Sequence, residues 1–249
     1  MTDVQRIELN EHRVPWFDRE RTGECHRLQH FEWNSRGSRV VADLVTPAAS
    51  TSPLPLVVLC GPTGISRGDS IVTRQAQRIA DLARAVAVVE LPLHGERGNP
   101  KLTPRLLASV NPGSSDNPLD AHLWSDLLDQ TESDLRGALD VLAGASKAEV
   151  SRTVFVGTGL GAALGVPFCL HEPRVRACVL AGLTDLVPAL DPASAIRGLA
   201  PRPVLLCGTQ DAQELDLGAH VECLRVRANA EEILEVAAQP VAAFLESAT

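Results

Sequence analysis

The 249-residue sequence contains no uninterrupted apolar stretch approaching the roughly 20 residues that a membrane-spanning helix requires. Its first residues, MTDVQRIELNEHR, are charged from the third position onward and lack the apolar core of a signal peptide. No CxxC pair occurs among the six cysteines, so neither a zinc site nor a disulfide framework is indicated. These absences predict a cytoplasmic protein with buried free thiols, no bound metal and no membrane partner.

Net charge and chain length bear on the partners of the protein and on its number of domains. The net charge of −8 argues against nucleic acid as a partner. With 45% hydrophobic residues, the chain is long enough to bury one sizeable core, and neither a repeat nor a linker divides it. We therefore expect a single domain over residues 1–249. The Pro-, Ser- and Asn-rich composition of residues 99–118 predicts a long loop or a small lid within it.

Short β-branched runs alternate with helical patterns along most of the chain. Residues 25–45 are typical of an antiparallel strand pair that turns at Ser35-Arg36-Gly37. Because the other strands are continuously apolar, they predict an α/β fold: a mostly parallel central sheet with helices on both faces. The expected strands are 56–60, 86–89, 153–156, 177–180, 204–207 and, less distinctly, 222–226. The expected helices are 70–84, 119–142 and one from about residue 230 that Pro240 divides or kinks.

A glycine-rich turn, Gly157-Thr158-Gly159-Leu160-Gly161-Ala162, joins one of these strands to a helix. It matches the dinucleotide fingerprint G-x-G-x-x-G/A. That fingerprint normally opens a domain and expects an acidic residue at the end of the next strand. Here three apolar strands, at 56–60, 86–89 and 153–156, precede the turn, and the next strand ends in Leu180-Ala181-Gly182. The turn also fits a nucleophile elbow, G-x-S-x-G, with glycine at the serine position. Glycine adopts the positive φ of an elbow without steric cost.

With this elbow, the chain resembles the α/β-hydrolase superfamily, especially its dienelactone-hydrolase and acyl-peptidase-like branches, from about residue 25 to its last residue. Residues 35–47 match the early strand pair of the family, and residues 54–64 match the strand and loop that supply the oxyanion hole. The segment ELPLHGERG, residues 90–98, resembles the family's D-x-P-G-H-G-x-R loop, in which His94 corresponds to a histidine that serves loop structure. The segment CGTQD, residues 207–211, resembles the strand end that carries the triad acid, here Asp211.

Three parts of the machinery that the resemblance implies are missing. Gly159 carries no nucleophilic oxygen, and Asn229 stands in the segment where the histidine base is expected. Pro62 occupies the position whose N–H would complete the oxyanion hole, yet proline has no N–H to donate. We therefore expect a degenerate member of the superfamily, in which Gly159 is an inactive nucleophile position and Asp211 a remnant of the triad acid.

Other residues could supply displaced catalytic groups. His220 is a candidate base if the helix that normally separates the acid from the histidine is deleted. Thr158 carries a hydroxyl, but it lies one position early on the turn. Cys60 could act as a thiolate only beside a basic group that lowers its pKa, so a buried inert thiol is the simpler interpretation.

The leading hypothesis is an α/β-hydrolase-fold protein without a Ser-His-Asp triad: a non-hydrolytic enzyme of the isomerase or lyase type in a biosynthetic pathway, or a ligand-binding pseudo-hydrolase. It requires no cofactor. Its partner would be an acyl or small organic molecule at the strand ends, and homodimerisation stays open. One alternative is an active carboxylester or thioester hydrolase with displaced catalytic residues. A second is a nucleotide-binding protein that uses Gly157–Ala162. The expected ligand-binding residues are Pro62, Thr63, His94, Thr158 and Leu160.

Overall fold

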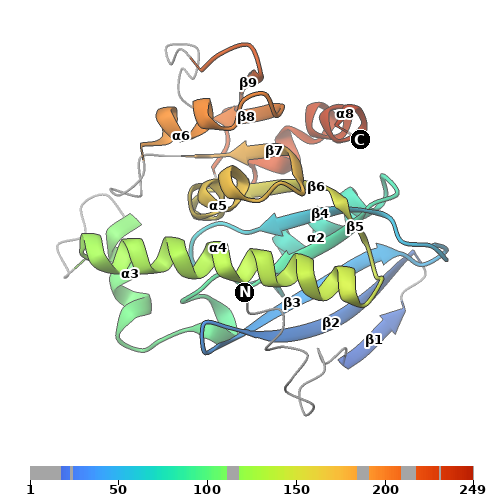
Figure 1. Ribbon diagram of the computed structural model, residues 1–249, viewed down its shortest axis with the longest axis horizontal. Helices are drawn as coiled ribbons and strands as arrows, with labels where there is room; N and C mark the ends of the chain where they lie inside the picture. The colour runs from blue at the N-terminus through green and yellow to red at the C-terminus, as the bar shows by residue number, and fades with distance from the viewer. Residues whose placement is uncertain are drawn as a thin grey trace.

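A nine-stranded sheet forms the centre of the protein, in the order β1-β2-β3-β5-β4-β6-β7-β8-β9 (Figure 1). The computed structural model describes residues 18–22, 25–110, 118–183, 191–208, 217–229 and 231–248. The three pairings from β1 to β5 are antiparallel and the five from β5 to β9 are parallel. The strands are β1 (Asp18–Thr22), β2 (His26–Ser35), β3 (Ser38–Pro47), β4 (Pro55–Cys60), β5 (Ala85–Val89), β6 (Glu149–Thr158), β7 (Val175–Ala181), β8 (Val204–Gly208) and β9 (Val221–Arg225).

Helices cover both faces of this sheet (Figure 1). On one face, α4 and α5 pack beside α6, and on the other α2 lies near α7 and α8. The predicted α/β architecture is therefore confirmed. No helix among the described residues combines the length and apolarity needed to cross a membrane. The helices are α2 (Ser70–Ala80), the 3-10 helix η1 (Gly95–Arg97), α3 (Leu102–Val110), α4 (Ala121–Gly144), α5 (Leu160–His171), α6 (Pro192–Gly198), α7 (Ile233–Val236) and α8 (Ala238–Ser247).

Strand β4 shows why its residues form a central strand. Leu56, Val58 and Cys60 are buried in the cluster beneath α4 and α5. The alternate residues, Val57 and Leu59, are buried in the cluster beneath α2 and α8. Because successive side chains point to opposite faces, only a continuously apolar run can serve both cores.

The predicted antiparallel pair at the start of the chain is β2 and β3. Ser35 pairs with Ser38 across a two-residue turn, in which Arg36 and Gly37 have φ of 47° and 79°. Two consecutive residues with positive φ are the requirement of a type I′ hairpin turn, whose twist suits the flanking strands. A further strand, β1, extends this side of the sheet, and the sequence did not predict it.

Helix α3 corrects part of the prediction of a loop or lid at residues 99–118. The Asn99 side chain accepts hydrogen bonds from the Lys101 and Leu102 N–H groups at 2.9 and 3.0 Å. Thr103 Oγ1 donates to the Leu93 carbonyl at 3.0 Å, which ties α3 to the loop after β5. Pro104 is tolerated because it lies in the first turn, where no intrahelical N–H bond is lost. Residues 111–117 of the predicted segment lie outside the described residues.

Candidate active site

Gly159 lies at the crest of the turn between β6 and α5. Its φ of 52° and ψ of −120° are in a region that residues with a side chain rarely adopt. The Gly159 N–H donates to the Ala181 carbonyl at 2.8 Å, and the Gly159 carbonyl accepts from Ala163 N–H at 3.2 Å. These bonds hold the turn to the end of β7 and to the first turn of α5. The predicted strand–turn–helix is confirmed, with an elbow-like backbone and no side chain at its crest.

The glycines that flank the crest allow close packing of the backbone. A Cβ at Gly161 would lie 2.5 Å from the Gly61 oxygen and 2.6 Å from the Cys60 oxygen. A Cβ at Gly157 would lie 2.5 Å from the Ala162 Cα. The start of α5 therefore rests directly on the end of β4. This packing accounts for the glycine pattern without a bound pyrophosphate, so the geometry favours the elbow over the dinucleotide fingerprint.

Four of the expected ligand-binding residues meet at this edge of the sheet. Cys60, at the end of β4, pairs with Gly157 of β6, so the loop with Pro62 and Thr63 leaves the sheet level with the turn that contains Thr158 and Leu160. Pro62, Thr158 and Leu160 are buried, whereas Thr63 is half-buried. The Thr158 hydroxyl donates to the Cys60 carbonyl at 3.4 Å. That hydroxyl is thus directed at the end of β4.

The Cys60 thiol is poorly suited to act as a nucleophile. Its side chain is fully buried. Burial raises the pKa of the Cys60 thiol well above its ordinary value, and the negative charge of Asp134 raises it further. The sequence predicted a reactive Cys60 only if a basic residue beside it lowered this pKa. The neighbouring charged residue is the acidic Asp134 instead. Cys60 therefore fits the interpretation of a buried inert thiol.

His220 and the elbow lie at opposite ends of the parallel strands. The elbow follows the C-terminal end of β6, whereas His220 precedes the N-terminal end of β9. Thr158 is level with Leu224 across the pairings of β6, β7, β8 and β9, whereas His220 precedes β9. The two positions are separated by four residues of about 3.3 Å along the strand direction and by three strand spacings of about 4.8 Å across the sheet. These perpendicular displacements combine to roughly 19 Å. The His220 ring makes a 3.1 Å hydrogen bond to the Ile196 carbonyl. His220 is therefore too far from the elbow to act as its base, contrary to the expectation. Its spacing from Asp211 in the sequence could not show at which end of the strands it lies.

Asn229 has a structural role where the family would have its histidine. Its side-chain oxygen accepts hydrogen bonds from the N–H groups of Glu231 and Glu232 at 3.1 and 2.8 Å. These bonds cap the helical turn that leads into α7. Asp211, the expected remnant of the triad acid, lies outside the described residues.

His94 lies in the loop that follows β5 and is 3% exposed. Its Nδ1 is 2.9 Å from the Pro92 carbonyl, and because a carbonyl only accepts, Nδ1 carries the proton. Burial lowers the pKa of His94, the hydrogen bond to Pro92 opposes this, and the charge of Arg97 lowers the pKa again. The ring is therefore neutral at physiological pH. Its hydrogen bond to Pro92 lies within the loop after β5, and a contact between His94 and a ligand stays a prediction.

A network of buried charges supports the two loops of the site. Arg97 pairs with Asp134 of α4 at 2.7 Å and donates to the Glu90 carbonyl at 2.9 Å. Arg67 pairs with Asp43 of β3 at 2.7 Å, and its backbone N–H donates to the Glu90 carboxylate at 3.2 Å. Burial is the largest influence on the carboxyl groups of Glu90 and Asp134, and it raises the pKa of each. The network joins the loops after β4 and β5 to each other and to the sheet.

The sequence offered one signal for this network. Asp134 falls within the apolar stripe of α4, directly before the buried Leu135, where a charged residue requires a partner. The identity of that partner depends on the tertiary fold, so Arg97 could not be assigned from spacing alone.

Neither the known family models nor the curated proteins include a match to this sequence. Solved structures do match it. A cold-adapted esterase from an Arctic intertidal metagenomic library, in a PEG-bound complex, is 15% identical, with a TM-score of 0.74 over 93% of this chain and 98% of that one. A putative acetyl xylan esterase from Bacteroides fragilis NCTC 9343 is 14% identical, with a TM-score of 0.70 over 99% and 85%. A dienelactone hydrolase-like promiscuous phosphotriesterase from metagenomic libraries is 15% identical, with a TM-score of 0.59 over 81% and 82%. These likenesses and the strand order establish that the chain has the α/β-hydrolase fold.

Proposed function

We propose that the protein binds an acyl or small organic molecule at the elbow edge of the sheet and processes or senses it without forming an acyl-enzyme at position 159. The observation that carries this proposal is the residue at the elbow crest. Gly159 adopts a backbone conformation suited to a nucleophile and has no side chain. On this proposal the protein is a cytoplasmic isomerase, lyase or ligand-binding protein with a small-molecule partner.

The surroundings of Gly159 support the proposal. Acyl transfer requires an oxygen or sulfur nucleophile, a base within hydrogen-bond reach and N–H donors for the oxyanion. The hydroxyl of Thr158 is directed at a carbonyl, and the Cys60 thiol is buried with a raised pKa. His220 is at the far edge, and Pro62 has no N–H. Binding energy at this edge would then serve recognition or proton movement, which needs no covalent intermediate.

A second candidate is a carboxylester or thioester hydrolase with displaced catalytic groups. It is favoured by the solved structures that are similar over most of their length, since one of those proteins is an esterase and the other a putative acetyl xylan esterase. In this case the nucleophile would be a residue other than Gly159, Thr158 or Cys60. Catalysed release of an alcohol or thiol would distinguish it from the first candidate.

Leu107 of α3 offers a test of ligand binding at this edge. This residue is 41% exposed, and its Cδ2 would lie 3.4 Å from a Cβ at Gly64, in the loop that bears Pro62 and Thr63. We expect alkanoyl p-nitroanilides to raise the midpoint of thermal unfolding in a saturable way. Leu107→Asp should weaken their binding about tenfold or more, because an apolar contact worth about 1.5–3 kcal/mol is lost.

The matched control is Val236→Asp, because Val236 is also an exposed large apolar residue, at 63%, but belongs to α7, after β9, and not to α3 or the loop after β4. We expect this variant to bind the same probes normally. Neither the unmodified protein nor either variant should release p-nitrophenol from p-nitrophenyl alkanoates faster than buffer does. NAD should not change the midpoint of thermal unfolding. Saturable ester turnover would reject the first candidate in favour of the second. A shift with NAD alone would favour nucleotide binding.

A further inference from the structure

The loop between β4 and α2 consists of two consecutive turns. In the first, the Ile65 N–H donates to the Pro62 carbonyl at 3.3 Å, and Gly64 has the positive φ, 76°, that the third residue of a type II turn requires. In the second, the Asp69 N–H donates to the Ser66 carbonyl at 3.0 Å. These bonds join residues three positions apart, so they set the shape of each turn but do not fix its place relative to the sheet.

Arg67, in the second turn, joins this loop to three distant parts of the chain. Its Nη1 donates to Asp43 Oδ2 of β3 at 2.7 Å, and its Nη2 donates to Glu96 Oε1 of η1 at 2.5 Å. Its backbone N–H donates to Glu90 Oε1, after β5, at 3.2 Å. The Arg67 side chain is only 12% exposed, so water and salt screen these charge-assisted bonds less than they would at the surface.

The carboxylates that bind the Arg67 guanidinium are themselves held in place. His30 Nδ1 lies 2.9 Å from Asp43 Oδ1, and Arg39 Nη1 lies 3.4 Å from Glu96 Oε2. Asp43 and Glu96 therefore offer two fixed acceptors, and the Arg67 side chain reaches both because its donors are spread over a rigid plane. An ammonium group is a compact point charge and does not reproduce this fork.

We propose that Arg67 is a positioning residue for the ligand site at the elbow edge, where it acts through the turn that carries Thr63. This inference rests on the proposed function, since Thr63 is one of the expected ligand-binding residues. Cys60 of β4 anchors one end of the turn and Arg67 the other. Without the second anchor the turn would also populate other positions, and the apparent affinity would fall with the fraction of molecules in which the turn is in place.

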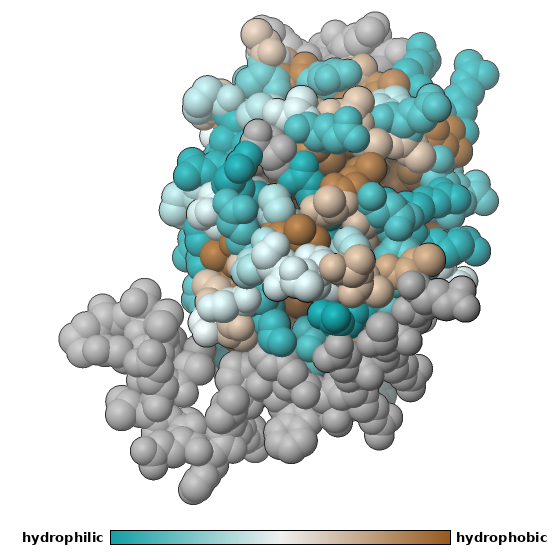
Figure 2. Space-filling view, turned by 90° about the vertical axis from the view of Figure 1, so that its right-hand side faces the viewer, coloured by the Kyte–Doolittle hydropathy of each residue, from teal (hydrophilic) through white to brown (hydrophobic). Residues whose placement is uncertain are grey.

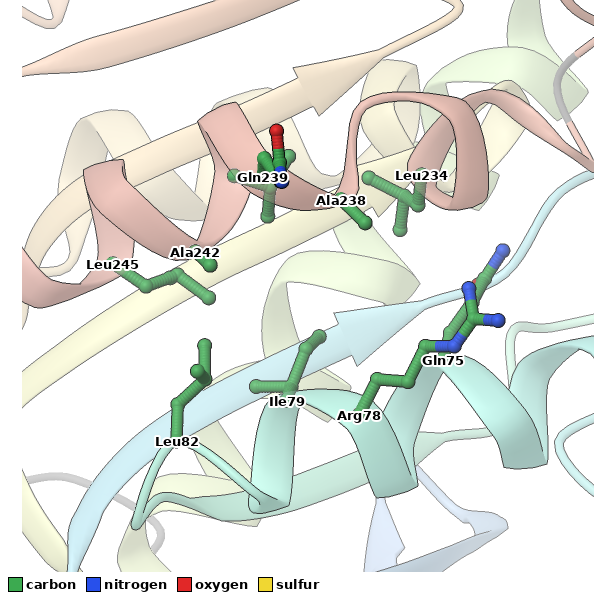
Figure 3. A pocket seen from close by; sticks show the side chains of 10 residues that line it. Gln75, Arg78, Ile79, Leu82, Leu234, Ala238, Gln239, Ala242 and Leu245 are labelled. Atoms are coloured by element: carbon green, nitrogen blue, oxygen red, sulfur yellow. The ribbon is translucent and has the colours of Figure 1, made fainter.

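The test has to separate the elbow edge from another apolar surface, the groove between α2 and α8. Ile79 and Leu82 point from α2 and its following turn toward Ala242 and Leu245 of α8 (Figure 3), around a cavity of about 250 Å³. Figure 2 shows apolar surface between hydrophilic side chains on this side of the molecule. An apolar probe that enters the groove would shift the methyl signal of Ile79, whereas a probe at the elbow edge would shift that of Ile65.

The experiment compares the unmodified protein with Arg67→Met and Arg67→Lys by methyl NMR. Ile65 packs against the buried cluster beneath α2 and α8, to which Ile79 belongs. In free Arg67→Met we expect the nuclear Overhauser effects between Ile65 and this cluster to weaken, with those of Ile79 unchanged. In titrations with octanoyl p-nitroanilide, the dissociation constant read at Ile65 should rise about tenfold, which corresponds to a turn in place in about one molecule in ten. Arg67→Lys keeps the charge but not the fork, so a rise of only about threefold is expected.

Arg174→Met is the matched control. Arg174 forms 2.7 Å ion pairs with Asp140 and Glu172, but it directly precedes β7, at the opposite end of the parallel strands from the elbow. This variant should lower the midpoint of thermal unfolding and leave the affinity for the probe and the contacts of Ile65 unchanged. An equal loss of affinity in Arg174→Met and Arg67→Met would show that affinity follows overall stability, which contradicts a positioning role.

Two further outcomes separate this inference from the proposed function. Unchanged Ile65 contacts in Arg67→Met, or the same affinity as in the unmodified protein, would overturn the role of Arg67; Arg67→Lys decides the same question if Arg67→Met does not fold. Failure of the unmodified protein to bind the probe at Ile65 would contradict the proposed function instead. The Ile65 contacts of the free proteins would then still decide whether Arg67 positions the turn.

Discussion

Replacing Gly161 with alanine should lower the free energy of unfolding by more than about 3 kcal/mol, at the upper end of the cost of overpacking. The new Cβ would lie 2.5 Å from the Gly61 oxygen and 2.6 Å from the Cys60 oxygen. Both are backbone atoms at the end of β4, so they cannot move aside as a flexible side chain could. The strand and α5 would have to separate, which would also displace the turn that contains Gly159.

Gly144→Ala is the matched control for this substitution. Gly144 is the last residue of α4, and a Cβ there meets nothing within 4 Å. Alanine should be neutral or stabilise the protein by up to about 1 kcal/mol, because it has the higher helix propensity. Urea denaturation, with midpoint and slope reported separately, measures both variants. A similar small effect at both positions would contradict the close contact between α5 and β4.

The second large effect is expected at the buried ion pair between the loop after β5 and α4. Arg97 and Asp134 have side-chain exposures of 8% and 2% and lie 2.7 Å apart. Arg97→Met would leave the Asp134 carboxylate buried without its cation. We expect a loss of about 3–5 kcal/mol in the free energy of unfolding. The double variant Arg97→Met/Asp134→Leu should recover more than half of this loss, because it removes both charges.

This loss should depend on pH in a defined direction. Burial already raises the pKa of Asp134, while Arg97, Ser35 and Gln130 oppose that rise. Without Arg97 the folded-state pKa rises further above the unfolded value of about 3.9, so the native protein binds more protons than the unfolded chain between these two values. Stability of Arg97→Met relative to the unmodified protein should therefore fall as pH increases through that window. Urea denaturation near pH 4.5 and pH 7.5 measures it, and an equal deficit at both pH values would contradict the account.

Much of the fold was predictable because its central elements carry strong local patterns. The continuously apolar β4 and the leucine stripe of α4 each specify one structure and one mode of burial. Pro240 predicted that the last helix is divided, and the structure has two helices there, α7 and α8, with Pro240 in the first turn of α8. Strand β1 has the sequence Asp18-Arg19-Glu20-Arg21-Thr22, which carries no apolar alternation, so only its pairing with β2 defines it. The short α6 was likewise absent from the prediction.

The candidate site was predictable only where it follows directly from a local turn. The Gly159 turn could be identified because its glycines, its strand and its helix are consecutive. His220 was a plausible base by spacing, yet the start of β9 puts it at the wrong edge. The Arg67 and Arg97 ion pairs join residues that are 24 and 37 positions from their carboxylates, and no local pattern encodes such partners.

Intact-mass spectrometry after incubation with a broad fluorophosphonate tests the central claim most directly, because this reagent phosphonylates the activated serine of a serine hydrolase. The protein, held at neutral pH and followed to a time at which a serine esterase is fully labelled, should show only its unmodified mass. A single stoichiometric adduct that maps to a residue at the edge formed by the ends of β4 and β6 would contradict the absence of a nucleophile at this elbow.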